Sequence, residues 1–339
     1  PADQAPSNSG QCQRQNKNDG GKYIFTFLDK DEDGLFKDMA EHADVVEFWP
    51  SHREDTRFNK PFKKLLMNHR IAKWGGWMFY NIHRYPFRKD VTYSLIIPTS
   101  SIGKLSVGYL RKLKKRHPNV RLFALVTDSM HADSPHMVYV RQKLLSDVWD
   151  AVLTYDKCDA KEYGFHWFGY CYYSFHGVGR GSQKSDLYYV GYDKGNRREK
   201  VESVYGYLKD RGVKCRFDVV GHRTKHDMEE SRIKYRNRKI SYWQVLECVQ
   251  GANCILEVLQ EGQEAQSIRY FEAVVYNKKL LTTNRHLSEL PFYDGRYMKY
   301  FEKPEDIDPA WVKEEEKIDY GYRNEFSPLH LIDYIKENF

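Results

Sequence analysis

Short apolar runs of strand length alternate with amphipathic stretches of helix length through the first half of the chain. Strands are expected at 22–28, Asp44–Phe48, Tyr93–Ile97, Arg121–Thr127 and Ala151–Tyr155. Helices are expected between them, at about 34–42, 57–80 (broken near Trp74–Trp77), Lys104–His117 and Pro135–Asp147. A strict alternation of strands and helices is typical of a parallel sheet with helices on both faces. The first half therefore predicts a doubly wound α/β domain.

The second half repeats this order after a stretch rich in glycine and serine, residues 176–186. Strands are expected at Leu187–Val190, Arg216–Val220, 233–236, Cys254–Leu259 and Lys279–Thr283, with helices at about 198–210, 241–250 and 266–276. The chain of 339 residues is long enough for about two domains. We predict two tandem Rossmann-like α/β domains, over 22–180 and 181–326. A final helix over 327–339 is expected to pack back on the first domain.

Composition narrows the class of protein without selecting a ligand. The net charge of +7 permits nucleotides, phospholipid surfaces or nucleic acid as partners. Nucleic acid is not expected, because the sequence has no RNP, KH or zinc-finger pattern. No window approaches the roughly 18 apolar residues of a membrane span. The polar residues 1–21 are expected to be a disordered linker or the edge of a longer polypeptide.

The six cysteines favour a reducing compartment. They show no C-x-x-C pair and no spacing with histidine that would suit zinc, and several stand in apolar runs, where a free cysteine behaves as a small hydrophobe. We therefore expect a cytoplasmic protein without a bound metal.

Loops that follow strands are the first places to look for a site, since ligands of open α/β sheets bind outside the carboxyl ends of the strands. In the second half, Gly191–Arg197 contains Gly191, Lys194, Gly195 and Arg197 just before a helix. Glycines let the backbone approach a phosphate, and a helix N-terminus offers free N–H groups. An ordinary glycine-containing turn explains the segment equally well.

The stretch Leu259–Asn284 is the more specific candidate. It is expected to run from a strand end through a polar loop into a short helix, with Glu264 and Glu272 eight positions apart. A carboxylate can accept hydrogen bonds from two ribose hydroxyls, and an arginine such as Arg269 near the helix start can balance a diphosphate. The alternative is a surface helix in which Arg269 and Glu272 form an i,i+3 ion pair. On spacing alone, both interpretations stay open.

Residues 254–284, CILEVLQEGQEAQSIRYFEAVVYNKKLLTTN, resemble the donor-site segment of GT-B glycosyltransferases. Many of those enzymes carry E-x7-E there, followed by a short helix and a strand ending in Thr-Asn. The segment more closely resembles glycosyltransferases of bacterial surface-polysaccharide (lipopolysaccharide and capsule) gene clusters. The similarity covers the half from Leu187 to Pro328, and the other half only by architecture. Ala265-Gln266-Ser267 stand where the retaining pattern has Gly-Phe-Gly, so the retaining outcome does not carry over with the motif.

This resemblance implies two domains that face a central cleft. The second would bind a nucleotide-sugar donor and the first a glycan or lipid-linked glycan acceptor, with no metal or other cofactor. The implied donor-binding residues are Gly191, Lys194, Gly195, Arg197, Glu264, Gln266, Ser267, Arg269 and Glu272. Glu272 would hold the ribose, and Lys194, Arg197 and Arg269 would balance the leaving diphosphate.

An inverting transfer also needs a general base near the acceptor hydroxyl. Asp128 is the first candidate because it follows a strand of the first domain, and His131 and Asp29 come next. The alternative for Asp128 is a capping or turn aspartate. In a retaining transfer these residues would only orient the acceptor.

A basic run lies on the helix expected at Lys104–His117: Arg111, Lys112, Lys114, Lys115 and Arg116. It is either a solvated helix face or a patch that rests on anionic lipid, where each basic residue contributes roughly 1 kcal/mol. The second interpretation would make the protein peripheral at a membrane.

Three other functions stay open at this stage. A GT-B-like sugar-nucleotide epimerase would keep the donor site but would not transfer the sugar. A non-catalytic sugar-binding module would bind without turnover, and a nucleic-acid-binding protein would use the basic charge directly.

Overall fold

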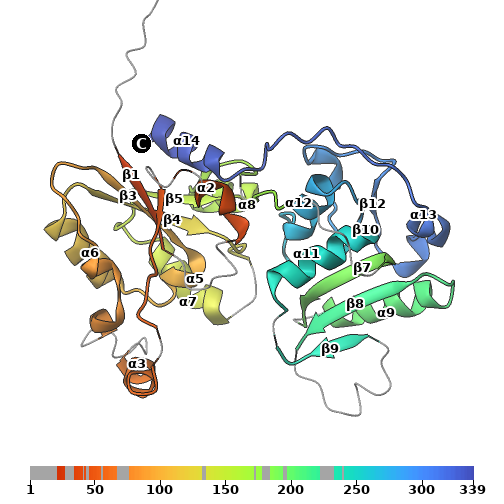
Figure 1. Ribbon diagram of the computed structural model, residues 1–339, viewed down its shortest axis with the longest axis horizontal. Helices are drawn as coiled ribbons and strands as arrows, with labels where there is room; N and C mark the ends of the chain where they lie inside the picture. Colours follow the sequence, from red (N-terminus) through yellow and green to blue (C-terminus); the bar gives the residue numbers. More distant parts are fainter. Residues whose placement is uncertain are drawn as a thin grey trace, which may run out of the picture.

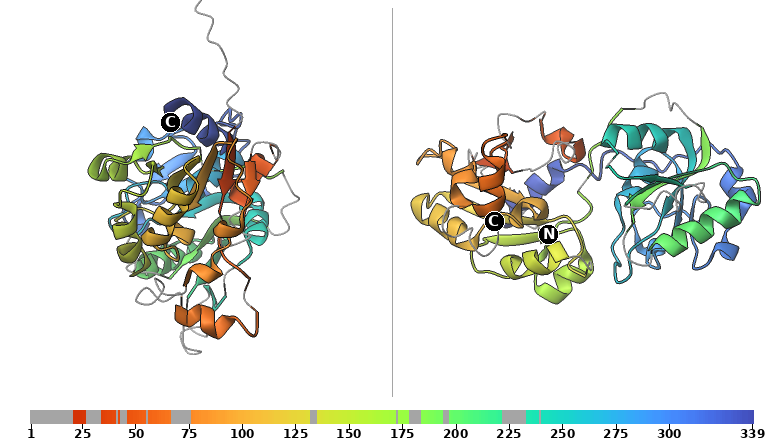
Figure 2. Two further views of the ribbon diagram at one scale, coloured as in Figure 1. Left: turned by 90° about the vertical axis from the view of Figure 1, so that its left-hand side faces the viewer. Right: turned by 90° about the horizontal axis from the view of Figure 1, so that it is seen from below.

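The computed structural model describes residues 21–339, except for 27–33, 41, 43–45, 55, 67–75, 132–134, 172, 178–183, 194–196, 222–232 and 239. Two parallel sheets form two domains that lie side by side (Figures 1 and 2). The predicted fold class, two tandem doubly wound α/β domains, is confirmed. No helix within the described ranges is long and apolar enough to cross a membrane.

The first sheet has six parallel strands in the order β2-β1-β3-β4-β5-β6. Their bounds are Lys22–Phe25 (β1), Val46–Phe48 (β2), Tyr93–Pro98 (β3), Val120–Val126 (β4), Ala151–Thr154 (β5) and His166–Trp167 (β6). All six residues of β3 are buried, as the central strand of a parallel sheet covered on both faces requires. The helices are Lys37–Ala40 (α2), Lys60–Leu66 (α3), Gly76–Phe79 (η1), Ile82–Arg84 (η2), Thr99–Ile102 (α5), Val107–Arg116 (α6), Pro135–Leu144 (α7) and Lys157–Tyr163 (α8).

The second sheet also has six parallel strands, in the order β12-β11-β10-β7-β8-β9. Their bounds are Ser185–Tyr192 (β7), Cys215–Val220 (β8), Lys234–Arg236 (β9), Ala252–Glu257 (β10), Lys279–Thr282 (β11) and Met298–Tyr300 (β12). The helices are Arg197–Lys209 (α9), Tyr242–Gly251 (α11), Ile268–Val275 (α12), Leu287–Glu289 (η3), Pro304–Asp306 (η4) and Pro309–Lys313 (α13). The chain winds outward from β7 through β8 to β9, then returns to pair β10 with the other edge of β7. Adjacent strands β7 and β10 therefore form a topological switch point.

The chain crosses between the domains twice, and the two crossings touch. Tyr173 N–H donates to the Phe326 carbonyl oxygen at 2.9 Å, and the Tyr173 ring lies parallel to Phe271 of the second domain. Beyond this point α14, Leu329–Asn338, returns to the first domain, where Leu331 and Ile335 join the cluster that contains the first strands (Figure 1).

Several elements differ from the sequence-based prediction. In the described part of 57–80, the expected long helix is the short helix α3 and one 3-10 helix, η1. The helix expected from Lys104 begins only at Val107, because Ser106 caps it by accepting a hydrogen bond from Tyr109 N–H. Short elements were missed, among them α5, β6, α8, β12 and α13. They are too short to show a hydrophobic periodicity, so their conformation depends on the residues that pack around them.

Candidate active site

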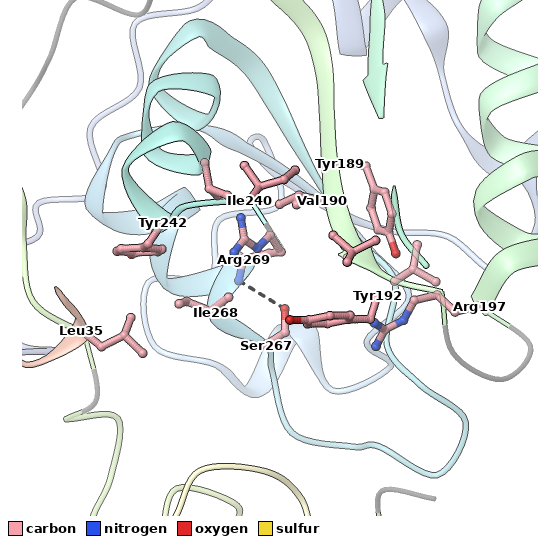
Figure 3. Close-up of a pocket in the computed structure, with 14 residues that line it drawn as sticks. Leu35, Tyr189, Val190, Tyr192, Arg197, Ile240, Tyr242, Ser267, Ile268 and Arg269 are labelled. Atoms are coloured by element: carbon pink, nitrogen blue, oxygen red, sulfur yellow. Dashed lines mark hydrogen bonds between the residues drawn. The ribbon is translucent and has the colours of Figure 1, made fainter. Parts of the chain in front are cut away.

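A pocket of about 330 Å³ opens at the carboxyl ends of β7, β8 and β10, at the switch point of the second sheet. Ligands of doubly wound sheets bind at this place because the loops diverge there and leave a crevice. Figure 3 shows Tyr242 and Leu35 on one side, Tyr192 and Arg197 on the other, and Arg269 between them. Leu35 comes from the first domain, so both domains contribute to the lining.

The N-terminus of α12 forms one wall of the pocket. Ser267 caps the helix by accepting a hydrogen bond from Arg269 N–H at 3.2 Å. Ser267 N–H in turn donates to Glu257 Oε1 at 2.7 Å, and Thr282 Oγ donates to the other oxygen, Oε2, at 2.5 Å. Glu257 is completely buried, and this burial raises the pKa of its carboxyl group. Glu257 thus fixes the start of α12 against the sheet.

Sequence reasoning missed Glu257. The available signal was an acidic residue at the end of a mostly apolar strand, ANCILE, just before the candidate loop that begins at Leu259. A buried carboxylate is stable only where it is hydrogen-bonded. A glutamate in an apolar strand therefore indicates that hydrogen-bond donors surround it in the folded protein.

Arg269 and Glu272 form an ion pair with 2.6 Å between Nη1 and Oε2. Arg269 lines the pocket, whereas Glu272 is completely buried and is not part of the lining. Burial raises the pKa of Glu272 to about 7, and the Arg269 guanidinium opposes this by lowering it. In this structure Glu272 therefore holds Arg269 instead of facing a ribose. The i,i+3 ion pair of the alternative interpretation is confirmed, but its surface position is wrong, since seven of the eight α12 residues are buried.

The segment after β7 supplies the opposite wall. Gly191 and Arg197 line the pocket, while Lys194 and Gly195 lie outside the described residues. A Cβ atom at Gly191 would overlap the Tyr189 hydroxyl and would lie 3.6 Å from Arg197 Nη1. The glycine is therefore needed for the close approach of these groups.

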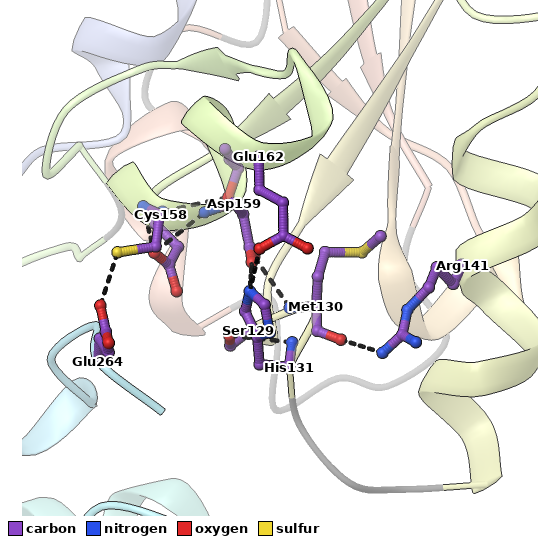
Figure 4. Close-up of polar contacts among 10 residues, drawn as sticks. Ser129, Met130, His131, Arg141, Cys158, Asp159, Glu162 and Glu264 are labelled. Atoms are coloured by element: carbon purple, nitrogen blue, oxygen red, sulfur yellow. Dashed lines mark hydrogen bonds and ion pairs between the residues drawn. The ribbon is translucent and has the colours of Figure 1, made fainter. Parts of the chain in front are cut away.

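Glu264 and Gln266 lie on the side of the loop that faces the first domain. Cys158 Sγ on α8 donates to Glu264 Oε2 at 2.8 Å (Figure 4). This hydrogen bond, with burial, raises the pKa of the Cys158 thiol to about 12. Gln266 is buried beside the same contact, in a small cavity of about 130 Å³. Glu264 also borders a wider cavity of about 430 Å³ that reaches Arg197.

In the first domain, His131 lies next to two carboxylates of α8 (Figure 4). Its Nε2 atom is 3.0 Å from Glu162 Oε2 and 3.7 Å from Asp159 Oδ1. Asp159 is completely buried, and its Oδ2 atom accepts a hydrogen bond from Met130 N–H at 2.9 Å. Burial raises the pKa of Asp159 to about 7. Asp128 is exposed in the same loop, and Asp29 lies outside the described residues.

Asp159 and Glu162 were missed because α8 was not predicted. Asp156 lies two residues after the end of β5 and caps α8 by accepting a hydrogen bond from Cys158 N–H at 2.8 Å. An aspartate after a strand, followed by further acidic residues at 159 and 162, was the available signal.

The basic run of α6 divides into two groups. Arg111 pairs with Asp147 at 2.5 Å and Lys114 with Asp150 at 2.8 Å. Lys112 and Arg116 instead line a separate pocket of the first domain, and Lys115 is exposed. Two cations of the predicted patch are thus paired with carboxylates, and membrane binding by the run stays a prediction. Among the described residues, no group of three His, Cys, Asp or Glu side chains is placed to hold a metal ion.

No protein-family model and no curated protein sequence matches the chain. Among solved structures, a protein from Listeria monocytogenes assigned as a UDP-N-acetylglucosamine 2-epimerase superposes with a TM-score of 0.53. The identity is 12%, over 94% of this chain and 96% of that one. The UDP-N-acetylglucosamine 2-epimerase of Rickettsia bellii gives 0.52, at 11% identity over 94% and 97% of the two chains. The apo structure of OtsA gives 0.52, at 9% identity over 94% and 99%.

The chain has the GT-B fold. At these identities the likeness is one of fold alone, and it spans both domains. The resemblance noted in the sequence is thereby supported at the level of architecture. The GT-B arrangement also explains why the Arg269 pocket and the His131 loop both lie at carboxyl edges of their sheets.

Proposed function

We propose that the chain is a glycosyltransferase that moves a sugar from a nucleotide-sugar donor to a glycan or lipid-linked glycan in surface-polysaccharide synthesis. The observation that carries this proposal is the switch-point pocket, which combines the α12 N-terminus with Arg269 and Arg197. Its apolar wall, formed by residues such as Ile240, Tyr242 and Val245, suits the base and ribose faces of a nucleoside.

The donor diphosphate would sit at the α12 N-terminus. The positive end of the α12 dipole favours an anion there. Arg269 is 8% exposed and is held by Glu272, so its guanidinium is oriented before the donor arrives. A fixed cation in a site with little water stabilises the charge that develops on the leaving diphosphate. We assign this role to Arg269 and Arg197, without a metal ion.

His131 takes the place of Asp128 as the preferred base for an inverting transfer. Its Nε2–H would donate to Glu162, which leaves Nδ1 free to accept a proton. The acceptor hydroxyl would lose its proton to Nδ1 as its oxygen bonds to the anomeric carbon and the bond from that carbon to the diphosphate oxygen breaks. Asp159 is a positioning residue, because it is buried and directed at the ring.

The contact between Cys158 and Glu264 supports the pairing of these two half-sites. Cys158 precedes Asp159 on α8, and Glu264 lies on the loop that leads to Ser267. The contact therefore brings the base loop of the first domain close to the donor loop of the second.

A sugar-nucleotide epimerase is the second candidate. Two of the proteins with the same fold are named UDP-N-acetylglucosamine 2-epimerases, and such an activity would use the same donor pocket. It would need no acceptor, so the nature of the product separates the two reactions.

A thermal-shift screen with UDP-, GDP-, CMP- and dTDP-sugars tests the donor pocket. One nucleotide class is expected to raise the melting temperature, because a ligand that binds only the folded state stabilises it. No shift with any nucleotide sugar would contradict the proposal. Incubation with the stabilising donor, followed by NMR of the sugar products, then distinguishes transfer and hydrolysis from epimerisation at C2.

A further inference from the structure

The excursion between β2 and β3 carries an exposed apolar stripe. Phe58, Phe62 and Leu65 are 85%, 64% and 58% exposed, and no residue of α3 is buried. Phe62 and Leu65, three positions apart, lie on one face of α3, and Phe58 lies in the turn just before that helix. Three large apolar side chains on one open face are uncommon in a soluble protein and mark a surface that meets another apolar phase.

Cations border this stripe. Arg57, Lys60 and Lys64 are exposed, and residues 56–66 contain no acidic side chain. A short helix with aromatic and aliphatic residues on one face and lysines around them is the pattern of a segment that lies in a membrane interface. The charge complements an anionic surface, whereas a neutral apolar partner would leave these lysines without a counterion.

The stripe continues into a pocket of the same domain. α3 packs against η1, where Trp77 is 50% exposed. Trp77 lines a cavity of about 340 Å³ together with Tyr109, Lys112, Arg116 and the two histidines His83 and His117. No carboxylate belongs to this lining. Burial, with nearby arginines, lowers the pKa of both histidines, so Lys112 and Arg116 supply the positive charge at neutral pH.

The position of this surface matters for the cleft. The excursion leaves the first sheet at the carboxyl end of β2, and the His131 loop leaves the same edge at the end of β4. Figure 1 shows α3 apart from the strands of the first sheet, at the end of this excursion. A bilayer in contact with α3 would therefore lie on the side of the domain where an acceptor has to enter.

We propose that α3, η1 and the Lys112–Arg116 pocket form a docking surface for an anionic phospholipid bilayer. Phe58, Phe62, Leu65 and Trp77 enter the headgroup region, and Lys112 and Arg116 bind a lipid phosphate between the rings of Trp77 and Tyr109. The protein is peripheral, and the docking surface keeps Lys112 and Arg116 of the basic run and adds α3 and η1 to them.

Co-sedimentation with vesicles tests this surface. The full chain is mixed with vesicles of phosphatidylcholine alone, or of phosphatidylcholine with phosphatidylglycerol, and no nucleotide sugar is present. Binding is expected only to the anionic vesicles, and it should weaken as salt is raised. Equal binding to both vesicles, or to neither, would overturn the proposal. The result does not depend on the donor pocket, whose failure would be seen separately in the thermal-shift screen.

Matched variants distinguish binding through the docking surface from effects of net charge or of exposed hydrophobic residues elsewhere. Lys112→Glu with Arg116→Glu should weaken binding by about 30-fold or more, from the loss of two cations near the membrane. Lys214→Glu with Lys317→Glu makes the same charge change on the second domain and should have little effect beyond that of net charge. Phe62→Ser with Leu65→Ser should also abolish binding, whereas Leu145→Ser changes a residue that directly follows α7 and is 56% exposed, and it should not. Unchanged melting temperatures show that each variant is folded.

A soluble phosphate ligand is the remaining outcome to exclude. Inorganic phosphate or glycerol phosphate should not displace the chain from anionic vesicles at millimolar concentrations. Complete displacement, or equal loss of binding in the control variants, would contradict docking on a bilayer.

Discussion

Helices α12 and α3 are similar in length and both carry aromatic and basic residues, yet they have opposite environments. Seven of the eight residues of α12 are buried, and none of the seven residues of α3 is. α12 connects the neighbouring central strands β10 and β11, so it must lie on the sheet. α3 belongs to a long excursion from the edge strand β2 and has no sheet beneath it. Both helices combine apolar and basic residues. Their difference in burial therefore follows from the length of the connection that contains each helix and from the order of the strands it joins.

The largest test of this comparison is the removal of one phenylalanine from each helix. Phe271→Ala should lower the free energy of unfolding by ~3–5 kcal/mol, because Phe271 is 1% exposed and contacts Tyr173 and Phe326. Phe62→Ala should change it by less than ~0.5 kcal/mol, because Phe62 is exposed. Urea denaturation of both variants gives the two values. Equal losses would show that α3 is buried in the folded protein.

The cation of α12 gives the next test. Arg269→Met should lower kcat/KM for sugar transfer. The expected loss of transition-state stabilisation is ~2–4 kcal/mol, the range for a preorganised electrostatic group. Arg88→Met is the control, because Arg88 forms an exposed ion pair with Asp90 that has no part in the site. Steady-state kinetics with the identified donor measures both. An unchanged rate in Arg269→Met would remove this residue from the mechanism.

The buried carboxylate of α12 gives the smallest effect, a pH dependence of stability. Burial raises the pKa of Glu272 from 4.5 to about 7, so the folded protein binds more protons than the unfolded chain between these values. Stability should therefore fall as pH rises through this window, with a slope of at most ~1.4 kcal/mol per pH unit for one proton. Glu272→Gln should flatten the slope, measured by urea denaturation at several pH values. Asp159, whose pKa is raised in the same direction, keeps part of it.

If wild type and Glu272→Gln show the same slope, Glu272 is ionised in the folded protein and its pair with Arg269 outweighs burial. That result would also change the comparison, because α12 would then carry a permanent buried ion pair.

The fold was predictable because buried parallel strands read as continuous apolar runs. β3, β4 and β10 stand out in this way, and the loops behind such strands correctly suggested Ser267, Arg269, Gly191 and Arg197 as neighbours. These residues do line one pocket, because the carboxyl ends of parallel strands meet at one edge of the sheet.

The environment of individual side chains was not predictable in the same way. Glu272 was expected at a ribose, but α12 turns it inward, and this depends on the pairing of β10 with both β7 and β11. His131 has its partners on α8, a helix of seven residues with no apolar period to announce it. The exposure of α3 likewise depends on tertiary packing, because no element among the described residues covers this face. The local sequence does not contain that information.

The paired crossings between the domains have a mechanical consequence. Tyr173 is bonded to Phe326, Ser174 N–H donates to the Leu35 carbonyl oxygen at 2.9 Å, and Ser327 Oγ donates to Asp38 Oδ2 at 2.6 Å. Three segments far apart in the sequence are thus joined at one place, which would act as a hinge between the domains. A rotation of the two domains about this tied region would be a hinge motion. Such a rotation would stretch the hydrogen bond between Cys158 and Glu264, which also joins the two domains. This bond would therefore hold the domains in the closed arrangement.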